Sequence, residues 1–380
     1  MTAPNSPHFR RLEVGEPAPW FAQRSESNPR YVFDTAAGRY IVLCFFGSAA
    51  AEPGRAALAF VQAHRSLFDD DTMAFFGVSN DPADEAQGRL AQSLPGVRYL
   101  WDFDGSVSRL YGAIPDEPMS GQTTLRPVWF VLDPTLRVIA AFPFNEADPA
   151  HGALSAFLRA LPPPDRFAGP ELQAPVLFLP NVFEPELCRT LIALYDAQGG
   201  TPSGFMREVD SRTVLVSDAA HKIRSDVVIE DTQLMSVLQR RVLRRIVPEM
   251  RKAFQFEATR LERYIVACYR AEDGGHFRQH RDNTTKGTAH RRFAVSINLN
   301  SDFDGGDLNF PEYGPRSFKP PPGAAVVFSC SLLHRVAPMT RGARYAFLPF
   351  LYDDAAAKIR EANNAFLGEG VGLYSERSEA

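Results

Sequence analysis

The chain has 380 residues, of which 45% are hydrophobic and 23% charged, and its formal net charge is −4. A chain of this length is longer than a single hydrophobic core usually supports, so two domains are expected. The small net charge gives no reason to expect nucleic acid or an anionic membrane as a partner. No apolar run is long enough to span a bilayer, and residues 1–15 lack the apolar segment of a signal peptide, so a cytoplasmic location is predicted.

Four cysteines are spread along the chain, and none belongs to a Cys-x-x-Cys pair. They are Cys44, Cys188, Cys268 and Cys330. Most of them fall in apolar stretches that are typical of strands. The pattern therefore favours buried free thiols over a disulfide framework or a cysteine-built zinc site.

A proline-rich stretch, Leu161–Pro170, separates two halves of different character. Proline fixes φ and removes a backbone donor, so neither a helix nor a central strand is expected to run through this stretch. We therefore expect a first domain over residues 1–160, a linker over residues 161–173 and a second domain over residues 174–380.

Before the linker, strand-like and helix-like segments alternate. The expected elements are a strand at 40–46, a helix at 53–67, a strand at 73–79, a helix at 83–94, and paired strands at 127–132 and 138–144. Alternation of this kind predicts an α/β sheet with helices on its faces.

Three segments of this half carry a family resemblance: Val14–Pro19, Cys44–Gly47 and Arg126–Asp133. With them, residues 12–160 resemble a thioredoxin fold of the peroxiredoxin type. In that family a threonine or serine and a reactive cysteine open the helix after the strand, and an arginine lies nearby. By spacing, Ala51 and Gly54 stand at the first two positions here, and only Arg126 matches the third.

Cys44 is the remaining candidate for a reactive thiol in this half. It lies within an apolar strand, where burial raises the pKa of a thiol and blocks access to it. We therefore expect no catalytic thiol, and interpret the first domain as a redox-degenerate module used for packing, dimerisation or substrate contact.

After the linker, helical periodicity gives way to short strand-like segments separated by glycine and proline. Helices are expected at 184–198 and at 233–254, the second interrupted by Pro248, and strands at 263–269, 293–300, 324–329 and 345–352. Helices followed by a run of short strands indicate a jelly roll, or double-stranded β-helix, buttressed by helices.

The segment His276-Phe-Arg-Gln-His-Arg-Asp-Asn283 and one later histidine form the most informative pattern. His280 and Asp282 are two apart at an expected strand end, so both side chains can lie on the same side of the chain. His334 ends an expected strand at 324–334. Two imidazoles and one carboxylate on one face are the ligand set of a non-haem Fe(II) facial triad, with open positions for an oxoacid and O₂.

Further residues strengthen an assignment that a His-x-Asp pair alone would leave weak. Arg344 follows on the next expected strand, where a guanidinium can bind the far carboxylate of 2-oxoglutarate in a fork. Tyr269 ends the strand before the His-x-Asp loop, and its hydroxyl is a second candidate for that carboxylate. Asp304–Pro311 supplies a Gly-Gly turn between the two histidines.

In this order of motifs, residues 174–353 resemble the prolyl-4-hydroxylase-like branch of the 2-oxoglutarate/Fe(II) oxygenases. The resemblance implies Fe(II) and 2-oxoglutarate as cofactors, with ascorbate as a candidate reductant. Three positions depart from that branch: Tyr269 lies two residues further from His280, Arg344 replaces a lysine, and Ala346 stands where some relatives have serine. Asp282 argues against the halogenase relatives, which replace this carboxylate with a small residue.

His276, Arg292 and Asn298 are the candidates for substrate contact. Asn298 alternates with apolar neighbours and is expected to face the barrel interior. Each candidate also has a plainer interpretation: a solvated strand-end histidine, a solvated turn over His290–Arg292, and an edge asparagine. The sequence leaves both interpretations open.

The chain is therefore predicted to be a dioxygenase that hydroxylates an unactivated C–H bond of an amino-acid, peptidyl or small-molecule substrate, with release of succinate and CO₂. One alternative is a thiol-independent redoxin-type binding protein, and another is a scaffold protein with an accessory metal site. Neither nucleic acid nor a membrane is expected as a partner, and a homodimer is expected from the habits of peroxiredoxin-like folds.

Overall fold

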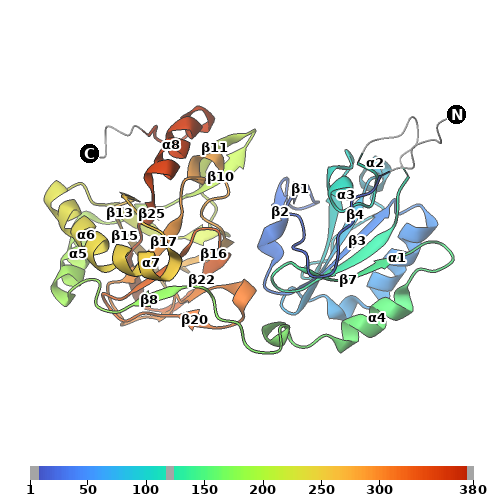
Figure 1. Ribbon diagram of the computed structural model, residues 1–380, viewed down its shortest axis with the longest axis horizontal. Helices are drawn as coiled ribbons and strands as arrows, with labels where there is room; N and C mark the ends of the chain where they lie inside the picture. The colour runs from blue at the N-terminus through green and yellow to red at the C-terminus, as the bar shows by residue number, and fades with distance from the viewer. Residues whose placement is uncertain (1–7, 117–123, 375–380) are drawn as a thin grey trace. The chain divides into compact units, whose positions relative to one another are not determined.

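The computed structural model describes residues 8–116 and 124–374 (Figure 1). It divides into two compact units, one of Met1–Gln173 with Pro311–Gly314, the other of Ala174–Phe310 with Pro315–Ala380. Each unit contains a large hydrophobic cluster of its own.

The first unit is built on a five-stranded sheet in the order β5-β4-β3-β6-β7. Its strands are β3 (Tyr40–Gly47), β4 (Met73–Ser79), β5 (Val97–Trp101), β6 (Val128–Leu132) and β7 (Val138–Pro143), and a small ribbon joins β1 (Ala22–Gln23) to β2 (Tyr31–Val32). β3, β4 and β5 are parallel, whereas β6 and β7 are antiparallel. Every residue of β3 and β4 is buried, as expected of apolar strands covered on both faces. The predicted α/β sheet is confirmed.

The helices of the first unit pack their apolar faces on this sheet. They are α1 (Glu52–Ala63), α2 (Pro82–Ala86), α3 (Ser106–Leu110) and α4 (His151–Ala160), with 3₁₀ turns η1 (Phe33–Ala36), η2 (Arg65–Leu67) and η3 (Pro164–Arg166). Phe60 of α1 and Leu154 of α4 belong to the same buried cluster as Val42 of β3. The expected helix at 83–94 is wrong in length, because α2 ends at Ala86 and Gly88 takes a left-handed φ of +60°.

The loop between β3 and α1 leaves no room at the position of the family's reactive cysteine. Gly54 is buried in the first turn of α1, and a Cβ there would lie 2.0 Å from the carbonyl oxygen of Ser48. Ala51, the residue before the helix, is exposed. Because the obstacle at position 54 is backbone, a side chain fits there only if the loop moves.

The second unit contains two sheets, and all their strand pairings are antiparallel. The larger sheet comprises β8 (Leu177–Leu179), β9 (Thr201–Pro202), β13 (Ser225–Val228), β14 (Arg260–Glu262), β15 (Ile265–Arg270), β17 (Phe293–Asn298), β21 (Ala325–Ser329), β24 (Ala343–Phe347) and β25 (Phe350–Tyr352). The smaller comprises β12 (Lys222–Ile223), β16 (His276–His280), β19 (Leu308–Asn309), β20 (Ser317–Phe318) and β22 (His334–Val336). Two ribbons pair β10 (Phe205–Val209) with β11 (Arg212–Val216), and β18 (Asp304–Gly305) with β23 (Met339–Arg341). Tyr269 of the larger sheet and Val336 of the smaller belong to one buried cluster, as facing layers of a jelly roll should.

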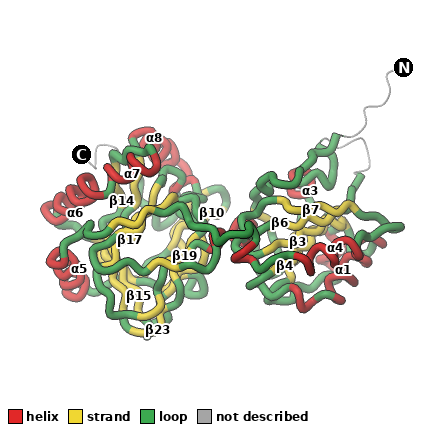
Figure 2. Tube along the Cα trace, turned by 60° about the horizontal axis from the view of Figure 1, so that its bottom comes forward, coloured by secondary structure: helices red, strands yellow, loops and turns green. Residues whose placement is uncertain are grey.

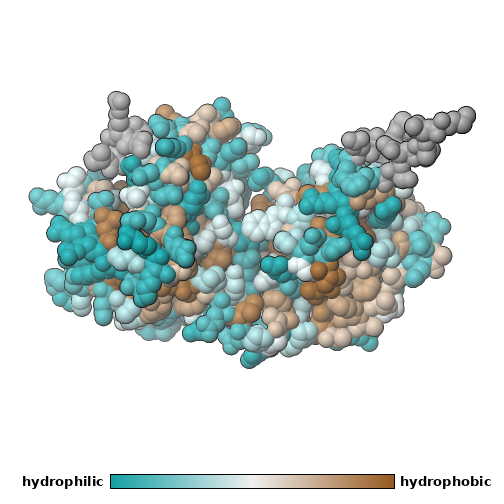
Figure 3. Space-filling view, in the orientation of Figure 1, coloured by the Kyte–Doolittle hydropathy of each residue, from teal (hydrophilic) through white to brown (hydrophobic). Residues whose placement is uncertain are grey.

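The helices of this unit lie along one side and the top of its strands in the view of Figure 2. They are α5 (Pro185–Gln198), α6 (Thr232–Arg245), α7 (Val247–Phe254) and α8 (Asp354–Ala362), with 3₁₀ turns η4 (Lys286–Thr288) and η6 (Asn363–Phe366). The 3₁₀ turn η5 (Pro311–Tyr313) is grouped with the first unit. Leu191, Val242 and Met250 from α5, α6 and α7 pack with Val266 and Ile297 of the larger sheet. The outward surface of these helices is mostly hydrophilic (Figure 3). Throughout the described residues, each helix is too short or too polar to cross a membrane.

Two expected strands of this unit are corrected. The strand expected at 324–329 is β21, but it does not continue to His334, which begins β22 in the other sheet after an intervening turn. The expected strand at 345–352 is two strands, β24 and β25, separated at Pro349, which has no N–H for a strand ladder.

We expect Gly54→Cys to destabilise the first unit by about 1–3 kcal/mol, because the new Cβ meets backbone atoms that cannot rotate away. Thermal unfolding followed by circular dichroism measures the effect. Ala51→Cys is the matched control on the exposed side of the same loop and is expected to change stability by less than about 0.5 kcal/mol. Equal stability of the two variants would show that position 54 accommodates a cysteine.

Candidate functional site

His280 and His334 are cross-strand partners in the smaller sheet, His280 at the end of β16 and His334 at the start of β22. Their ring centroids are 4.3 Å apart. Asp282 follows in the loop after β16, and its backbone N–H donates to the carbonyl of Cys330 at 2.9 Å. Strand pairing thus brings His334 to His280 and Asp282, from which it is widely separated in the sequence.

The three side chains direct their metal-binding atoms toward one another. His280 Nε2 lies 3.5 Å from Asp282 Oδ1, and His334 Nε2 lies 3.3 Å from Asp282 Oδ2. One ligand atom from each residue lies within 4.8 Å of the others. The Nδ1 atoms face backbone carbonyls, at 2.7 Å for His280 and 3.0 Å for His334. An Nδ1–H that donates to a carbonyl leaves Nε2 free for a metal, so this donor set fits Fe(II).

The electrostatic surroundings favour the metal-binding protonation states. Burial lowers the pKa of His280 to about 4, and the neighbouring His334 acts in the same direction. Burial alone would raise the pKa of Asp282, but the two histidines hold it well below its ordinary value. At neutral pH the site therefore offers a neutral imidazole from His280 and an ionised carboxylate, which are the forms that bind a cation.

A buried guanidinium lies on the facing sheet. Arg344 in β24 is 2% exposed, and burial lowers its pKa. Its Nε donates to Asn298 Oδ1 at 2.9 Å, its Nη2 to Ser296 Oγ at 2.8 Å, and its Nη1 to the Gly306 carbonyl at 3.1 Å. These acceptors are neutral, and Asp307 acts on the guanidinium only through space. A buried cation held by neutral groups suits an anionic ligand.

Tyr269 and Ser296 complete the surroundings of Arg344. Tyr269 is its cross-strand partner on β15, and the guanidinium carbon lies 5.6 Å from the centre of the tyrosine ring. Ser296, on the adjacent β17, accepts a hydrogen bond from Arg344, whereas Ala346 on β24 has no hydroxyl to offer. The sequence pattern did not single out Ser296, although it shares the inward face of β17 with Asn298.

The three residues predicted to contact substrate lie in different surroundings. Asn298 is wholly buried, accepts a hydrogen bond from Arg344 and donates its amide to a backbone carbonyl at 2.8 Å. His276 Nδ1 lies 2.8 Å from a backbone carbonyl of the preceding turn, and Arg292 donates to a backbone carbonyl at 3.0 Å. Both ends of the Asn298 amide are thus occupied, which favours a role in positioning Arg344.

A buried acid that the sequence pattern did not single out, Glu262, lies behind the metal loop. It accepts hydrogen bonds from His290 Nε2 at 2.8 Å and Arg291 Nε at 2.6 Å, and Arg360 of α8 lies 3.0 Å away. Arg291 also donates to the backbone carbonyl of Asp282 at 3.4 Å. The interpretation of 290–292 as a solvated turn is therefore wrong for the first two residues, which belong to an internal ionic network.

Lys222 and Arg224 are two further buried basic residues, and with Asp226 they lie at every second position of an extended segment. Burial, and next the neighbouring Arg224, lower the pKa of Lys222 to about 5. Residues at every second position of an extended chain share one face. The surrounding segment is itself polar, so the sequence gives no signal that these charged side chains are buried.

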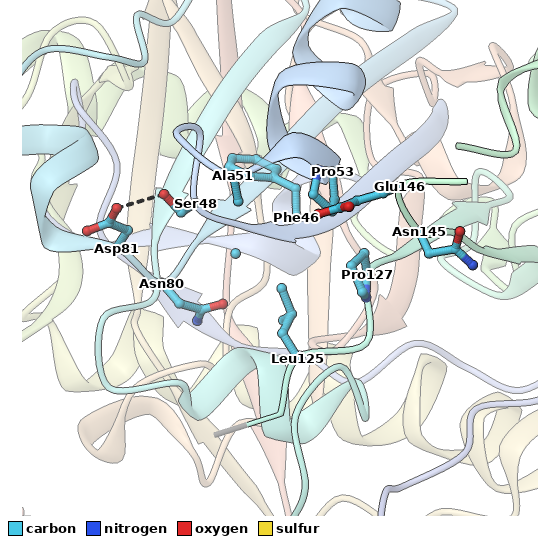
Figure 4. A pocket seen from close by; sticks show the side chains of 11 residues that line it. Phe46, Ser48, Ala51, Pro53, Asn80, Asp81, Leu125, Pro127, Asn145 and Glu146 are labelled. Carbon is cyan, nitrogen blue, oxygen red and sulfur yellow. Dashed lines mark hydrogen bonds between the residues drawn. The ribbon is translucent and has the colours of Figure 1, made fainter. Parts of the chain in front are cut away.

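The first unit contains a pocket of about 560 Å³ beside the loop between β3 and α1 (Figure 4). Ser48, Asp81 and Glu146 are among its polar lining residues, and the Ser48 hydroxyl donates to the Asp81 carboxylate at 2.7 Å. Cys44 is wholly buried in β3, and burial raises the pKa of its thiol well above the ordinary value. These surroundings favour binding over thiol chemistry.

Comparison with known proteins matches each unit to a different family. Residues 264–352 match the model of the 2OG-Fe(II) oxygenase superfamily, and residues 14–141 match that of the AhpC/TSA family. The chain joins an AhpC/TSA region to a 2OG-Fe(II) oxygenase region. The oxygenase match contains His280, Asp282, His334 and Arg344. Both resemblances inferred from the sequence are thus confirmed, and the oxygenase superfamily implies Fe(II) and 2-oxoglutarate as cofactors.

Curated relatives of the oxygenase region are PKHD-type hydroxylases. The one from Synechococcus sp. (strain JA-2-3B'a(2-13)) is 34% identical over 89 residues, and PKHD-type hydroxylase PiuC from Pseudomonas aeruginosa is 39% identical over 91 residues. Each match covers 22% of this chain and 39% of the relative. The chain thus spans well under half the length of these relatives.

Solved structures similar to parts of the chain include a prolyl-4-hydroxylase and a peroxidoxin. A prolyl-4-hydroxylase from Pseudomonas putida is 18% identical, with a TM-score of 0.35, over 50% of this chain and 96% of that one. Peroxidoxin BcpB from Mycobacterium tuberculosis is also 18% identical, with a TM-score of 0.32, over 40% of this chain and 99% of that one.

We expect His334→Ala to lower the affinity for Co(II), a redox-stable substitute for Fe(II), by about 100-fold or more, since residues that merely orient a ligand already contribute about 10–100-fold. Titration followed by visible absorption measures the affinity. His276→Ala, on the same strand as His280, is the control and should bind Co(II) like the wild type. Wild-type affinity in His334→Ala would remove this histidine from the metal site.

Proposed function

We propose that the second unit is a 2-oxoglutarate- and Fe(II)-dependent dioxygenase that hydroxylates an unactivated C–H bond of an amino-acid, peptidyl or other small substrate. The observation that carries this proposal is the juxtaposition of two complementary sites on facing sheets. The His280, Asp282 and His334 donors suit a divalent cation, and Arg344, with neutral hydrogen-bond partners, suits a carboxylate. One molecule that chelates a metal through its keto acid and ends in a second carboxylate satisfies both.

The residues of the chain bind and orient, and the cofactors supply the oxidative chemistry. When bound, Fe(II) and 2-oxoglutarate activate O₂, with release of succinate and CO₂ and hydroxylation of the substrate. The two Nε2 atoms and the Asp282 carboxylate would hold the metal. Arg344, already oriented by Asn298 and Ser296, would receive the far carboxylate in a forked hydrogen bond.

Aromatic rings lie beside both imidazoles and would exclude water from the reacting atoms. The ring of Phe277 stacks on His280 with centroids 3.5 Å apart, and the ring of Phe328 lies 4.7 Å from that of His334. These contacts fix the planes of the imidazoles and keep the surroundings of the metal apolar. A dry site protects a strong oxidant from side reactions and therefore supports hydroxylation.

The proposal also assigns roles to the rest of the chain. We retain a redox-degenerate domain over 1–160, a linker over 161–173 and a catalytic domain over 174–380. A first domain without a reactive thiol is proposed to serve packing or substrate contact, and a homodimer remains part of this proposal. Four buried free cysteines suit a reducing compartment, which supports a cytoplasmic location.

The activity is tested by incubating the full chain with Fe(II), ascorbate and 2-oxoglutarate and measuring succinate. We expect Arg344→Met to raise the half-saturating concentration of 2-oxoglutarate by about 10-fold or more, because a charge-assisted hydrogen bond contributes about 1.5–3 kcal/mol. The control is Arg341→Met, which removes an exposed arginine paired with Asp304 and should leave that concentration unchanged. Absence of oxoglutarate-dependent succinate in the wild type contradicts the proposed function, and an unchanged Arg344→Met variant assigns the carboxylate to another cation.

A further inference from the structure

A second buried arginine lies beside the predicted oxoglutarate anchor and has no part in the function proposed above. Arg224 is 6% exposed and lies where the chain passes from β12 in the smaller sheet to β13 in the larger. Its Nη1 lies 3.5 Å from the Tyr269 hydroxyl, and its guanidinium carbon lies 5.8 Å from the centre of that ring. Arg224 and Arg344 therefore both border Tyr269.

The strand register shows which way these side chains point. Asp226 pairs with Ala267 and Tyr269 pairs with Arg344, and residues that face each other across a pair share one side of the sheet. The opposite side is the helix-covered core that contains Cys268. Arg224, two residues before Asp226, thus points with Tyr269 into the interior between the sheets.

Lys222 extends this basic surface toward the metal ligands. It pairs with Phe277 on β16, and its Nζ lies 5.0 Å from the centre of the Phe277 ring, which itself stacks on His280. The Nζ donates to Ser203 Oγ at 2.8 Å and to the Gly204 carbonyl at 2.5 Å. Lys222 and Arg224 therefore connect the metal side of the interior with its oxoglutarate side.

The charges of this cluster do not cancel. Arg224 donates to Asp226 Oδ2 at 2.6 Å, and Arg263 lies 3.5 Å from the same oxygen. Burial opposes ionisation of Asp226, but Arg224 and Arg263 outweigh it and lower the pKa of Asp226 to about 2. Two guanidinium groups thus share one carboxylate, and among the described residues neither Arg224 Nε nor Asp226 Oδ1 has a hydrogen-bond partner. Arg263 is 29% exposed, so water screens part of its charge, whereas burial lowers the pKa of Lys222 to about 5. An anion beside Lys222 and Arg224 would stabilise the cationic forms of both buried side chains.

The cofactors do not provide this anion. A divalent metal and Arg344 together offset the Asp282 carboxylate and the two carboxylates of 2-oxoglutarate. We therefore propose that Lys222 and Arg224 bind a carboxylate of the prime substrate, and that the enzyme hydroxylates a small free acid, such as an amino acid, in preference to a residue within a peptide. This inference rests on the proposed function and specifies its substrate class. Because both side chains are almost fully buried, the acid must enter the interior, which suits a small molecule.

The test uses the full chain loaded with Fe(II) and 2-oxoglutarate, and the protein amino acids in matched pairs with their carboxamides. We expect at least one free acid, and not its amide, to stimulate succinate formation above the basal rate. The same acid should raise the melting temperature of the inactive Ni(II)–oxoglutarate form, a readout that needs no turnover. Oxoglutarate-dependent turnover that no acid stimulates more than its amide overturns the inference and leaves the proposed function intact. Absence of oxoglutarate-dependent turnover both without additives and with every acid and amide refutes the function itself.

Substitution then assigns the contact. Arg224→Gln and Lys222→Met should each raise the half-saturating concentration of the stimulating acid by about 10-fold relative to that of 2-oxoglutarate. Arg224→Lys keeps the positive charge and should recover part of the affinity for the acid that Arg224→Gln loses. Such a recovery would show that the loss does not come from misfolding. Arg270→Gln is the matched control, since Arg270 lies over Tyr195 of α5 on the opposite side of the sheet. A rise in the half-saturating concentration of 2-oxoglutarate alone would make Arg224 a cofactor anchor and overturn the inference.

Discussion

The pairing of β16 with β22 is the constraint on which the metal centre depends. It places His280 opposite His334, and a slip of one residue would turn one imidazole to the other face of the sheet. Between the pairs Phe277–Val336 and His280–His334, β16 contains one residue more than β22, so the ladder is irregular there. Such bulges re-aim side chains next to functional sites. The local departure from regular pairing is therefore part of how the ligands meet.

The larger sheet separates apolar packing from polar chemistry by the simple alternation of its strands. Val295 and Ile297 pack under the helices, whereas Ser296 and Asn298 face the interior and hold Arg344. The same strand thus packs against the helices through one face and positions the ligand-binding arginine through the other. The arginine is oriented by its strand neighbours before any ligand arrives, which reduces the cost of orienting it on binding.

Much of this arrangement could be predicted from sequence because its signals are local. The strand at 73–79, the helix near 184–198 and the triad residues follow from periodicity and from one short motif with known chemistry. What the sequence could not supply depends on contacts between distant residues. Glu262 meets His290 only through the tertiary fold, and the passage from β21 to β22 is a change of sheet that an unbroken apolar pattern conceals. The early end of α2 depends on one glycine, Gly88. One glycine destabilises a helix only slightly, so a longer helical periodicity can hide the effect.

The ionic network around Glu262 has a consequence for the thermodynamics of metal capture. The loop that carries Asp282 is held from one side by its N–H bond to Cys330 and from the other by Arg291, which is itself fixed on Glu262. A loop restrained in this way has already lost most of its backbone freedom during folding, so the arriving ion does not have to order it. The conformational entropy of bringing the ligands together is therefore lost during folding and not during metal binding. The metal affinity of the centre then depends mainly on the strength of its coordination bonds.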